Sequence, residues 1–249
     1  MISFTNVAKR FVVDGNPYVV FEDVSLDIRE GEFLCLLGPS GCGKSTFLNM
    51  LAGFEPASAG SVSVRGQVVT DTGKDRGVVF QASDALFDWL DVTANVELAL
   101  KVKRVPREQR AVIRDKFVKL VGLSGQEKKY PSQLSGGMRQ RVQLARVLAN
   151  DPEILLMDEP FGALDAQTRR LMQNELVGIW GESRKTVLFI THDIDEAIIL
   201  ADRIVVMSKG PRAKIAATYE VDLPRPREHG TQYMALWNDV NRSLAPTAH

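Results

Sequence analysis

The sequence predicts an α/β fold organised around a mostly parallel sheet. In the second half of the chain, short apolar runs alternate with segments of helical character, in the order 154–157, 166–180, 187–190, 194–201 and 204–207. Strands that alternate with helices indicate a parallel sheet with right-handed crossovers. A further apolar run, Phe33–Leu37, leads into a glycine-rich loop and a helical segment that Gly53 ends. We therefore expect this loop at the carboxyl edge of the sheet, where ligands bind in such folds.

The composition excludes several classes of protein. The chain has 249 residues, of which 45% are hydrophobic and 25% charged, so it suits one large globular domain or two small ones. Lys plus Arg and Asp plus Glu balance at 31 each, without the basic excess of a nucleic-acid binder. The two cysteines, Cys35 and Cys42, are too few for a disulfide framework, so we expect reduced thiols in a cytosolic protein. No apolar run approaches the ~18 residues of a membrane-spanning helix, and Met1–Asn6 lacks a signal-peptide pattern.

The glycine-rich loop matches the pattern G-x-x-x-x-G-K-[ST]. Glycines let backbone N–H groups approach phosphate oxygens, and the start of the next helix adds partial positive charge. In this pattern Lys44 reaches the terminal phosphates and the Ser45 hydroxyl ligates Mg²⁺. A chance glycine turn is the competing interpretation, and the strand and helix around the loop argue against it. The predicted phosphate site comprises Gly38, Pro39, Ser40, Gly41, Cys42, Gly43, Lys44, Ser45 and Thr46.

The segments on either side of this strand–loop–helix unit read as further strands. Runs at 18–21, 24–28 and 61–64 are separated by turns at 14–17, 30–32 and 65–66. These connections leave no room for crossover helices, so we expect antiparallel pairing. Phe11 and Tyr18 are the aromatic residues here that an adenine ring would stack on, although most aromatics at strand positions belong to a core. A buried run at 78–80 ends at Gln81, which places that side chain at a strand end.

Residues 82–150 have helical periodicity, and we interpret them as a helical subdomain inserted into the sheet domain. Helices are predicted over 92–102, 106–121 and 139–149. Before the last of these, Leu134–Met138 reads L-S-G-G-M. A serine and two glycines at a helix start form a second anion-binding element, or an ordinary N-cap and turn when taken alone.

Polar residues follow two of the buried strands. Asp158 and Glu159 come after 154–157, and His192 comes shortly after 187–190. Because the carboxyl ends of parallel strands meet at one edge, these side chains should share the edge that carries the glycine loop. Solvated acids and a structural histidine are the competing interpretation. The remaining tail, 211–249, is polar and proline-containing, with a short helix expected near 233–244.

Taken together, the motifs resemble the ATP-binding subunits of ABC transporters. Gly38–Thr46, Gln81, Leu134–Met138, 154–159, Gly162–Asp165 and His192 occur in the family's order, over about residues 2–210. The resemblance implies a P-loop NTPase (RecA-like) core with an antiparallel β subdomain and an inserted α-helical subdomain at about 82–150. The ABC ATPase domain would span 1–210, with a short C-terminal extension at 211–249. The sequences L-S-G-G-M-R-Q-R-V, D-E-P-F-G-A-L-D and V-D-L-P-R-P-R look like the nitrate/sulfonate/taurine importer branch.

The resemblance also implies a role for each matched residue. Glu159 would polarise the attacking water, and His192 would contact the γ-phosphate. Gln81 would sense the γ-phosphate and Mg²⁺. Asp158 and Ser45 would be further ligands of the Mg²⁺ ion. Phe11 occupies the place of the aromatic that stacks on adenine, with Tyr18 as its substitute because the loop between them is longer than in many relatives. The nucleotide-binding set is completed by Ser135, Gly136, Gly137 and Asp165, and Met138 stands where many relatives have Gln.

The implied activity is hydrolysis of ATP with Mg²⁺ to power the import of a small solute. The Ser135–Gly137 element would complete the site of a second ATP-binding subunit, as a homodimer or a heterodimer. The other partners would be an integral membrane permease and, indirectly, a solute-binding protein, with no nucleic acid. The subunit would sit at the cytoplasmic face of the inner membrane through the permease, for which 85–90 is a candidate contact. An exporter's ATPase subunit and an ABC ATPase of DNA repair are the alternatives, and the solute stays open.

Overall fold

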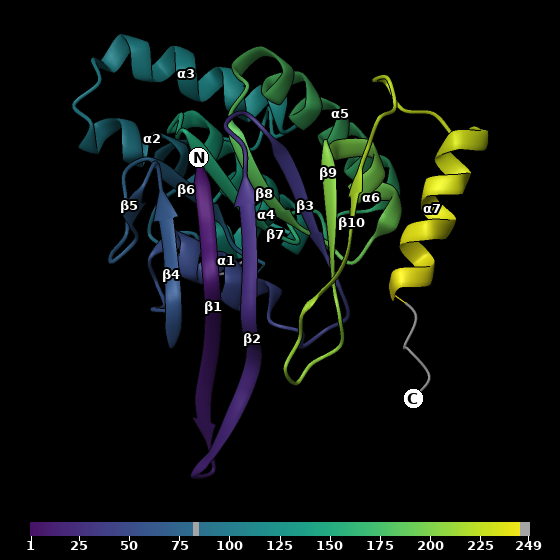
Figure 1. Ribbon diagram of the computed structural model, residues 1–249. Coiled ribbons are helices and arrows are strands. Elements are labelled where there is room, and N and C mark those ends of the chain that lie inside the picture. Colours follow the sequence, from purple (N-terminus) through teal and green to yellow (C-terminus); the bar gives the residue numbers. More distant parts are fainter. Residues whose placement is uncertain (82–84, 245–249) are drawn as a thin grey trace. The chain divides into compact units, whose positions relative to one another are not determined.

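The computed structural model describes residues 1–81 and 85–244 (Figure 1). Its contacts divide the chain into two compact units. The first combines Met1–Arg76 with the chain from Arg184 onward, and the second is Gly77–Ser183. Residues 82–84, the expected start of the helical subdomain, and 245–249, the end of the expected extension, lie outside the described residues. The domain bounds inferred from the sequence stay a prediction.

The parallel sheet predicted from the apolar runs is present in the first unit. Its strands lie in the order β10-β9-β3-β8, where β3 is parallel to both β9 and β8 and β10 is antiparallel to β9. Every residue of β3 and β8 is buried, which explains their continuously apolar sequences. The bounds are β3 Phe33–Leu37, β8 Thr186–Ile190, β9 Arg203–Met207 and β10 Ile215–Glu220.

A second sheet of the first unit is antiparallel, as the short connections predict. Its order is β2-β1-β4-β5, formed by β1 Ile2–Val13, β2 Asn16–Ile28, β4 Ala59–Val64 and β5 Gln67–Val68. The turn predicted at 14–17 is shorter than expected, because only Asp14 and Gly15, both with positive φ, connect β1 to β2. Pro17 fits within β2 because β2 is an edge strand of this sheet.

The described residues of the first unit form three helices, α1 Lys44–Ala52, α6 Ile194–Leu200 and α7 Thr231–Leu244. Helix α1 ends at Gly53, whose left-handed φ of 81° lets its N–H bond back to the last turn. Phe47 of α1 stacks on Phe4 of β1 with ring centroids 3.8 Å apart, and this contact joins the helix to the antiparallel sheet. None of the helices within 1–81 and 85–244 is both long and apolar enough to cross a membrane.

The second unit begins within strand β6 and ends with helix α5, and its other strand, β7, comes just before α5 in the sequence. Asn95 of α2 is fully buried and donates to the carbonyls of Phe87, Leu90 and Asp91, which fixes the start of this helix. Glu97 of α2 pairs with Arg114 of α3 at 2.6 Å. The elements are β6 Arg76–Val79, α2 Val92–Val102, α3 Arg107–Leu120, the 3₁₀ turn Pro131–Gln133, α4 Gly136–Ala149, β7 Ile154–Asp158 and α5 Ala166–Ser183. The predicted helices at 92–102, 106–121 and 139–149 are therefore present, the last of them starting three residues earlier.

The two glycines that follow α1 and β4 allow a test of the packing around α1. Both have positive φ, but a Cβ on Gly53 would lie 2.1 Å from the Asp71 backbone oxygen, whereas a Cβ on Gly66 would meet nothing within 4 Å. We expect Gly66→Ala to lower the free energy of unfolding by about 1 kcal/mol, the cost of the left-handed conformation. Gly53→Ala should lower it by about 3 kcal/mol or more, because the backbone must also move. Equal losses in urea denaturation would contradict this account.

Candidate functional site

The glycine-rich loop connects the end of β3 to the start of α1, and its geometry requires glycine at specific positions. Gly43 has φ 95°, and a Cβ there would lie 2.4 Å from Val20 Cγ1 of β2. Gly38 has no such φ, but its Cβ would lie 2.8 Å from Cys42 Sγ and 3.0 Å from the Met207 backbone oxygen. The loop is thus packed closely between β2 and the end of β9, which fixes the direction of its peptide groups.

Helix α1 begins directly after this loop, with Gly43 as its N-cap. The first four N–H groups of an α-helix have no partner within the helix. In the described part of the chain, no side-chain hydrogen bond caps α1 either. The first turn, Lys44–Thr46, therefore presents N–H groups and the positive end of the helix dipole, and Ser45 is exposed there. This arrangement suits a phosphate group.

Lys44 lies in the same loop and is only 7% exposed. Its Nζ donates to the Gly38 carbonyl at 2.8 Å and to the Pro39 carbonyl at 3.1 Å. Both acceptors belong to the loop itself, so they hold the ammonium group within the loop that precedes α1. A buried ammonium needs such partners, since desolvation of an unpaired charge is costly.

The thiol of Cys42 is buried beneath the loop. Burial raises the pKa of Cys42, and the nearby Lys44 ammonium only partly opposes this effect. The thiolate is the reactive form of cysteine, so this side chain packs the loop and is not a nucleophile. Cys35, on β3, is also buried and free, as the sequence predicts.

His192 follows β8 at the same sheet edge as the glycine loop. Leu36 of β3 pairs with Ile190 of β8 in parallel register, so Gly38 and His192 each lie two residues beyond a paired position. The Thr191 N–H also bonds to the Leu36 carbonyl at 3.4 Å. His192 is exposed, whereas Thr191 before it is buried. The predicted placement of loop and histidine at one edge of the first unit is therefore confirmed.

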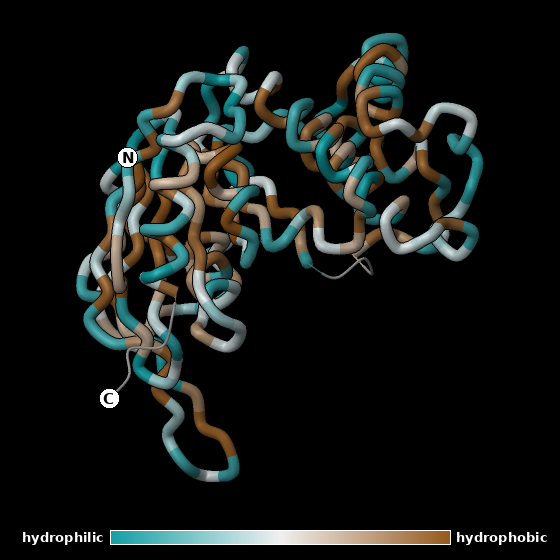
Figure 2. The backbone as a smooth tube through the Cα atoms, turned by 90° about the vertical axis from the view of Figure 1, so that its right-hand side faces the viewer, coloured by the Kyte–Doolittle hydropathy of each residue, from teal (hydrophilic) through white to brown (hydrophobic). Residues whose placement is uncertain are grey.

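The two candidate aromatics face each other across the β1–β2 hairpin. Phe11 and Tyr18 are direct partners in the antiparallel register and are 37% and 41% exposed. The loop expected between them is only the two-residue turn Asp14–Gly15, because strand pairing continues to Val13 and Asn16. Lys9 Nζ lies 4.8 Å from the Phe11 ring centroid. Val13, 53% exposed, lies two residues beyond Phe11 on the same face of β1 and extends this apolar surface toward the free end of the hairpin, which carries a brown stretch in Figure 2.

The second unit brings together two of the predicted catalytic residues. Strands β6 and β7 are neighbours, and Gln81 and Glu159 lie just beyond their carboxyl ends. Gln81 Nε2 donates to Glu159 Oε2 at 3.2 Å. Glu159 has a left-handed φ of 45°, which is unusual for a residue with a side chain. Asp158 is the last residue of β7 and, like Glu159, is partly buried.

Gln140 is a residue of this site that the sequence analysis did not single out. It lies on α4, is 2% exposed, and uses both ends of its amide. Its Nε2 donates to the Glu159 backbone oxygen at 3.0 Å, and its Oε1 accepts from the Ala163 N–H at 3.0 Å. It therefore fixes the backbone on which the Glu159 carboxylate is carried. The sequence indicated only that Gln140 lies on the buried face of α4. An ordinary core residue has the same kind of position, so this signal could not identify Gln140 as part of the site.

The serine–glycine element forms the start of α4. Ser135 is its N-cap and accepts from the Met138 N–H at 3.3 Å, which is the capping geometry that the sequence suggested. A Cβ on Gly137 would lie 2.9 Å from the Ala163 backbone oxygen, so glycine permits a close approach there. Asp165 accepts hydrogen bonds from the N–H and hydroxyl of Thr168, and these bonds lower the pKa of Asp165.

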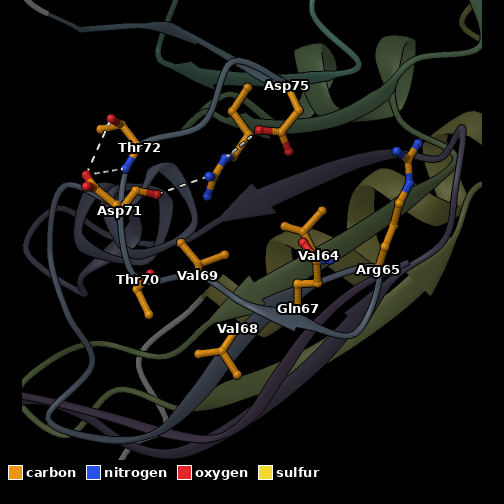
Figure 3. A pocket seen from close by; sticks show the side chains of 10 residues that line it. Val64, Arg65, Gln67, Val68, Val69, Thr70, Asp71, Thr72 and Asp75 are labelled. Carbon is orange, nitrogen blue, oxygen red and sulfur yellow. Dashed lines mark hydrogen bonds and ion pairs between the residues drawn. The ribbon is translucent and has the colours of Figure 1, made fainter.

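A pocket of about 510 Å³ in the first unit contains none of the predicted site residues (Figure 3). It lies beside the β4–β5 turn and is lined by residues between Val64 and Arg76. Arg76 is held there by Asp75 at 3.2 Å and by the Asp71 and Leu51 carbonyls. Its charge is satisfied within the chain, so we do not assign the nucleotide to this pocket.

Comparison with known proteins gives consistent results. The family model described as ABC transporter matches residues 21–162. The nitrate import ATP-binding protein of Synechococcus elongatus is 50% identical over 230 residues, covering 91% of this chain and 83% of that protein. A bicarbonate transport ATP-binding protein of Synechocystis is 48% identical over 230 residues, covering 91% and 81%. The structure of a dimeric bacterial ABC transporter cassette superposes with a TM-score of 0.82 at 34% identity, covering 89% of this chain and 99% of that chain.

Proposed function

The chain belongs to the ABC transporter family of ATP-binding proteins, and on that premise we propose that it hydrolyses ATP to power import of a small solute through a membrane permease. The observation that carries this proposal is the start of α1, which no side chain caps in the described residues, together with the Lys44 ammonium that two loop carbonyls hold in the same loop. The names of the relatives support a small anion such as nitrate or bicarbonate, and the branch motifs add sulfonates and taurine.

The phosphates of ATP would be bound by the N–H groups of the glycine loop and by the Lys44 ammonium. Mg²⁺ usually keeps several waters and binds to proteins through a few oxygen ligands, of which one or two are carboxylates, besides phosphate oxygens. The exposed Ser45 hydroxyl and the Asp158 carboxylate fit that requirement, with Gln81 as a further oxygen donor. When bound, the ion neutralises charge that develops on the phosphates. Phe11 or Tyr18 would stack on the adenine.

Glu159 is our candidate for the residue that polarises the attacking water. Its carboxylate accepts from Gln81, and its backbone is fixed by Gln140, so both the charge and its direction are constrained. Hydrolysis of ATP depends on an oriented water and on charge stabilisation more than on covalent chemistry. His192 would contact the γ-phosphate at the end of β8. Asp165, beside the start of α5, would contribute to nucleotide binding.

A second copy of the chain would complete each site. The Ser135 hydroxyl and the first N–H groups of α4 form another helix start suited to phosphate, and a solved relative of 34% identity is dimeric. ATP would then favour the closed pair because it binds that state more tightly. The permease would hold the pair at the cytoplasmic face of the membrane, and a solute-binding protein would act on the other side.

The role of Glu159 predicts a separation of binding from turnover. We expect Glu159→Gln to bind ATP with unchanged affinity. Its turnover should fall by about 10²- to 10⁴-fold, which is the contribution of a positioned general base. Glu175→Gln on the exposed face of α5 is the matched control and should keep full turnover. Turnover is measured by phosphate release and binding by nucleotide fluorescence. Normal hydrolysis by Glu159→Gln would remove this residue from the role.

The role of Ser135 predicts an ATP-dependent dimer. In the Glu159→Gln background, addition of ATP and Mg²⁺ should double the mass measured by light scattering. A further Ser135→Arg change places a bulky side chain at the start of α4, so we expect the mass to stay that of one chain. Both variants should bind ATP alike, since the glycine loop is unchanged. A stable dimer of the Ser135→Arg variant would exclude this face.

The transport role predicts an integral membrane partner. The tagged chain, purified from detergent-solubilised membranes of its own cell, should carry a permease with it, and alkaline carbonate should strip it from intact membranes. Stimulation of its ATPase by DNA would instead favour the repair class. A gene for a solute-binding protein next to its own would separate import from export.

A further inference from the structure

The motif V-D-L-P-R-P-R, Val221–Arg227, has no role in the function described so far. Its side chains alternate in exposure: Asp222, Pro224 and Pro226 are exposed, whereas Val221, Leu223, Arg225 and Arg227 are buried or half-buried. An extended segment with this alternation turns one set of side chains toward the protein. Both arginines belong to that inward set.

Arg227 binds the carboxyl end of α6. Its Nη1 donates to the Ile198 carbonyl at 2.6 Å and to the Ala201 carbonyl at 2.5 Å. The last carbonyls of a helix have no partner within it, and a cation there is favourable. Burial lowers the pKa of Arg227 to about 10, so it remains charged at neutral pH.

Arg225 reinforces the same end of the helix. Its Nη2 donates to the Leu200 carbonyl at 2.6 Å, and its Nη1 pairs with Asp202 at 3.0 Å. Two side chains from one short segment therefore bind the last turn of α6, a helix of only seven residues.

The chain then returns along the helix and reaches its other end. Helix α7 packs against α6 (Figure 1), and the buried Tyr233 in the first turn of α7 donates its hydroxyl to Asp195 Oδ1 at 2.7 Å. Asp195 lies in the first turn of α6. The C-terminal segment, Val221–Tyr233, thus binds α6 at both ends of the helix.

The first turn of α6 follows His192 after a single residue. Asp193 caps the helix by accepting from the N–H groups of Asp195 and Glu196, and its own N–H donates to Thr191 Oγ1. Thr191 in turn donates to Glu196 at 2.7 Å. The residues on both sides of His192 are therefore fixed to α6, and a shift of α6 would carry the imidazole with it.

We propose that the C-terminal segment positions His192 through α6, with Tyr233 as the positioning residue. This inference rests on the proposed contact of His192 with the γ-phosphate. The C-terminal segment is then part of the working site.

The test uses the full-length chain with Tyr233→Phe, which removes one hydroxyl and keeps the ring. Steady-state hydrolysis should show kcat lowered between about fivefold and about 100-fold, the loss that a displacement of 1 Å can produce, with KM for ATP unchanged. The matched control is Tyr219→Phe, because the Tyr219 hydroxyl holds the far end of α7 at the Asp239 carbonyl and Ser243. This control should keep wild-type kcat.

A spectroscopic measurement separates positioning from a general loss of stability. The chain has three histidines, so the imidazole NMR signals can be assigned by single substitutions. Tyr233→Phe should shift or broaden the His192 signal, whereas Tyr219→Phe should leave it in place. A Tyr233→Phe protein with unchanged kcat and an unchanged His192 signal would overturn the proposal.

A double-mutant cycle connects the effect to the histidine. In a His192→Ala background, Tyr233→Phe should lower kcat no further. An equal loss in both backgrounds would mean that Tyr233 acts elsewhere, and would overturn the inference while leaving the function intact. Full turnover by His192→Ala alone would instead remove the proposed role of His192, and the positioning role with it.

Discussion

The start of α1 is the constraint on which the rest of the molecule depends. An uncapped helix end leaves several N–H groups directed at one point, with a partial charge of about half a proton. The chain keeps this end ordered by packing Gly43 against β2 and Gly38 against the end of β9. Strand β3 must therefore lie centrally between β8 and β9, and the stacking of Phe47 on Phe4 ties α1 to the second sheet.

Local signals explain how much of the fold could be predicted. Strand β3 and helix α2 have the predicted bounds, since a continuous apolar run marks the first and helical periodicity marks the second. The predicted turns at 30–32 and 65–66 also separate strands. Strand β10 was missed, because its half-exposed sequence I-A-A-T-Y-E has no local signature and depends on pairing with β9. The predicted helix near 233–244 begins two residues earlier, at Thr231.

The candidate site also contains residues that local sequence signals identify and one that they do not. Gly38–Thr46 could be identified because its spacing alone specifies the backbone geometry, and Gln81, Asp158 and His192 because each lies at the carboxyl end of a strand. Gln140 could not, since its two hydrogen bonds reach residues 19 and 23 positions away in the chain. The choice between Phe11 and Tyr18 stays open for a physical reason: they are opposite each other on one hairpin, so both meet the requirement for an exposed ring.

The two carbonyls that hold the Lys44 ammonium have a consequence for selectivity. The side chain is ordered before any ligand arrives, so little rotamer entropy is lost on binding. A neutral ligand that displaced the Gly38 and Pro39 carbonyls would gain nothing, because one uncharged acceptor would replace another. Only an anion improves on these partners, because it adds a charge–charge attraction to the ammonium that an uncharged carbonyl does not supply. The loop thus discriminates against adenosine through its own backbone.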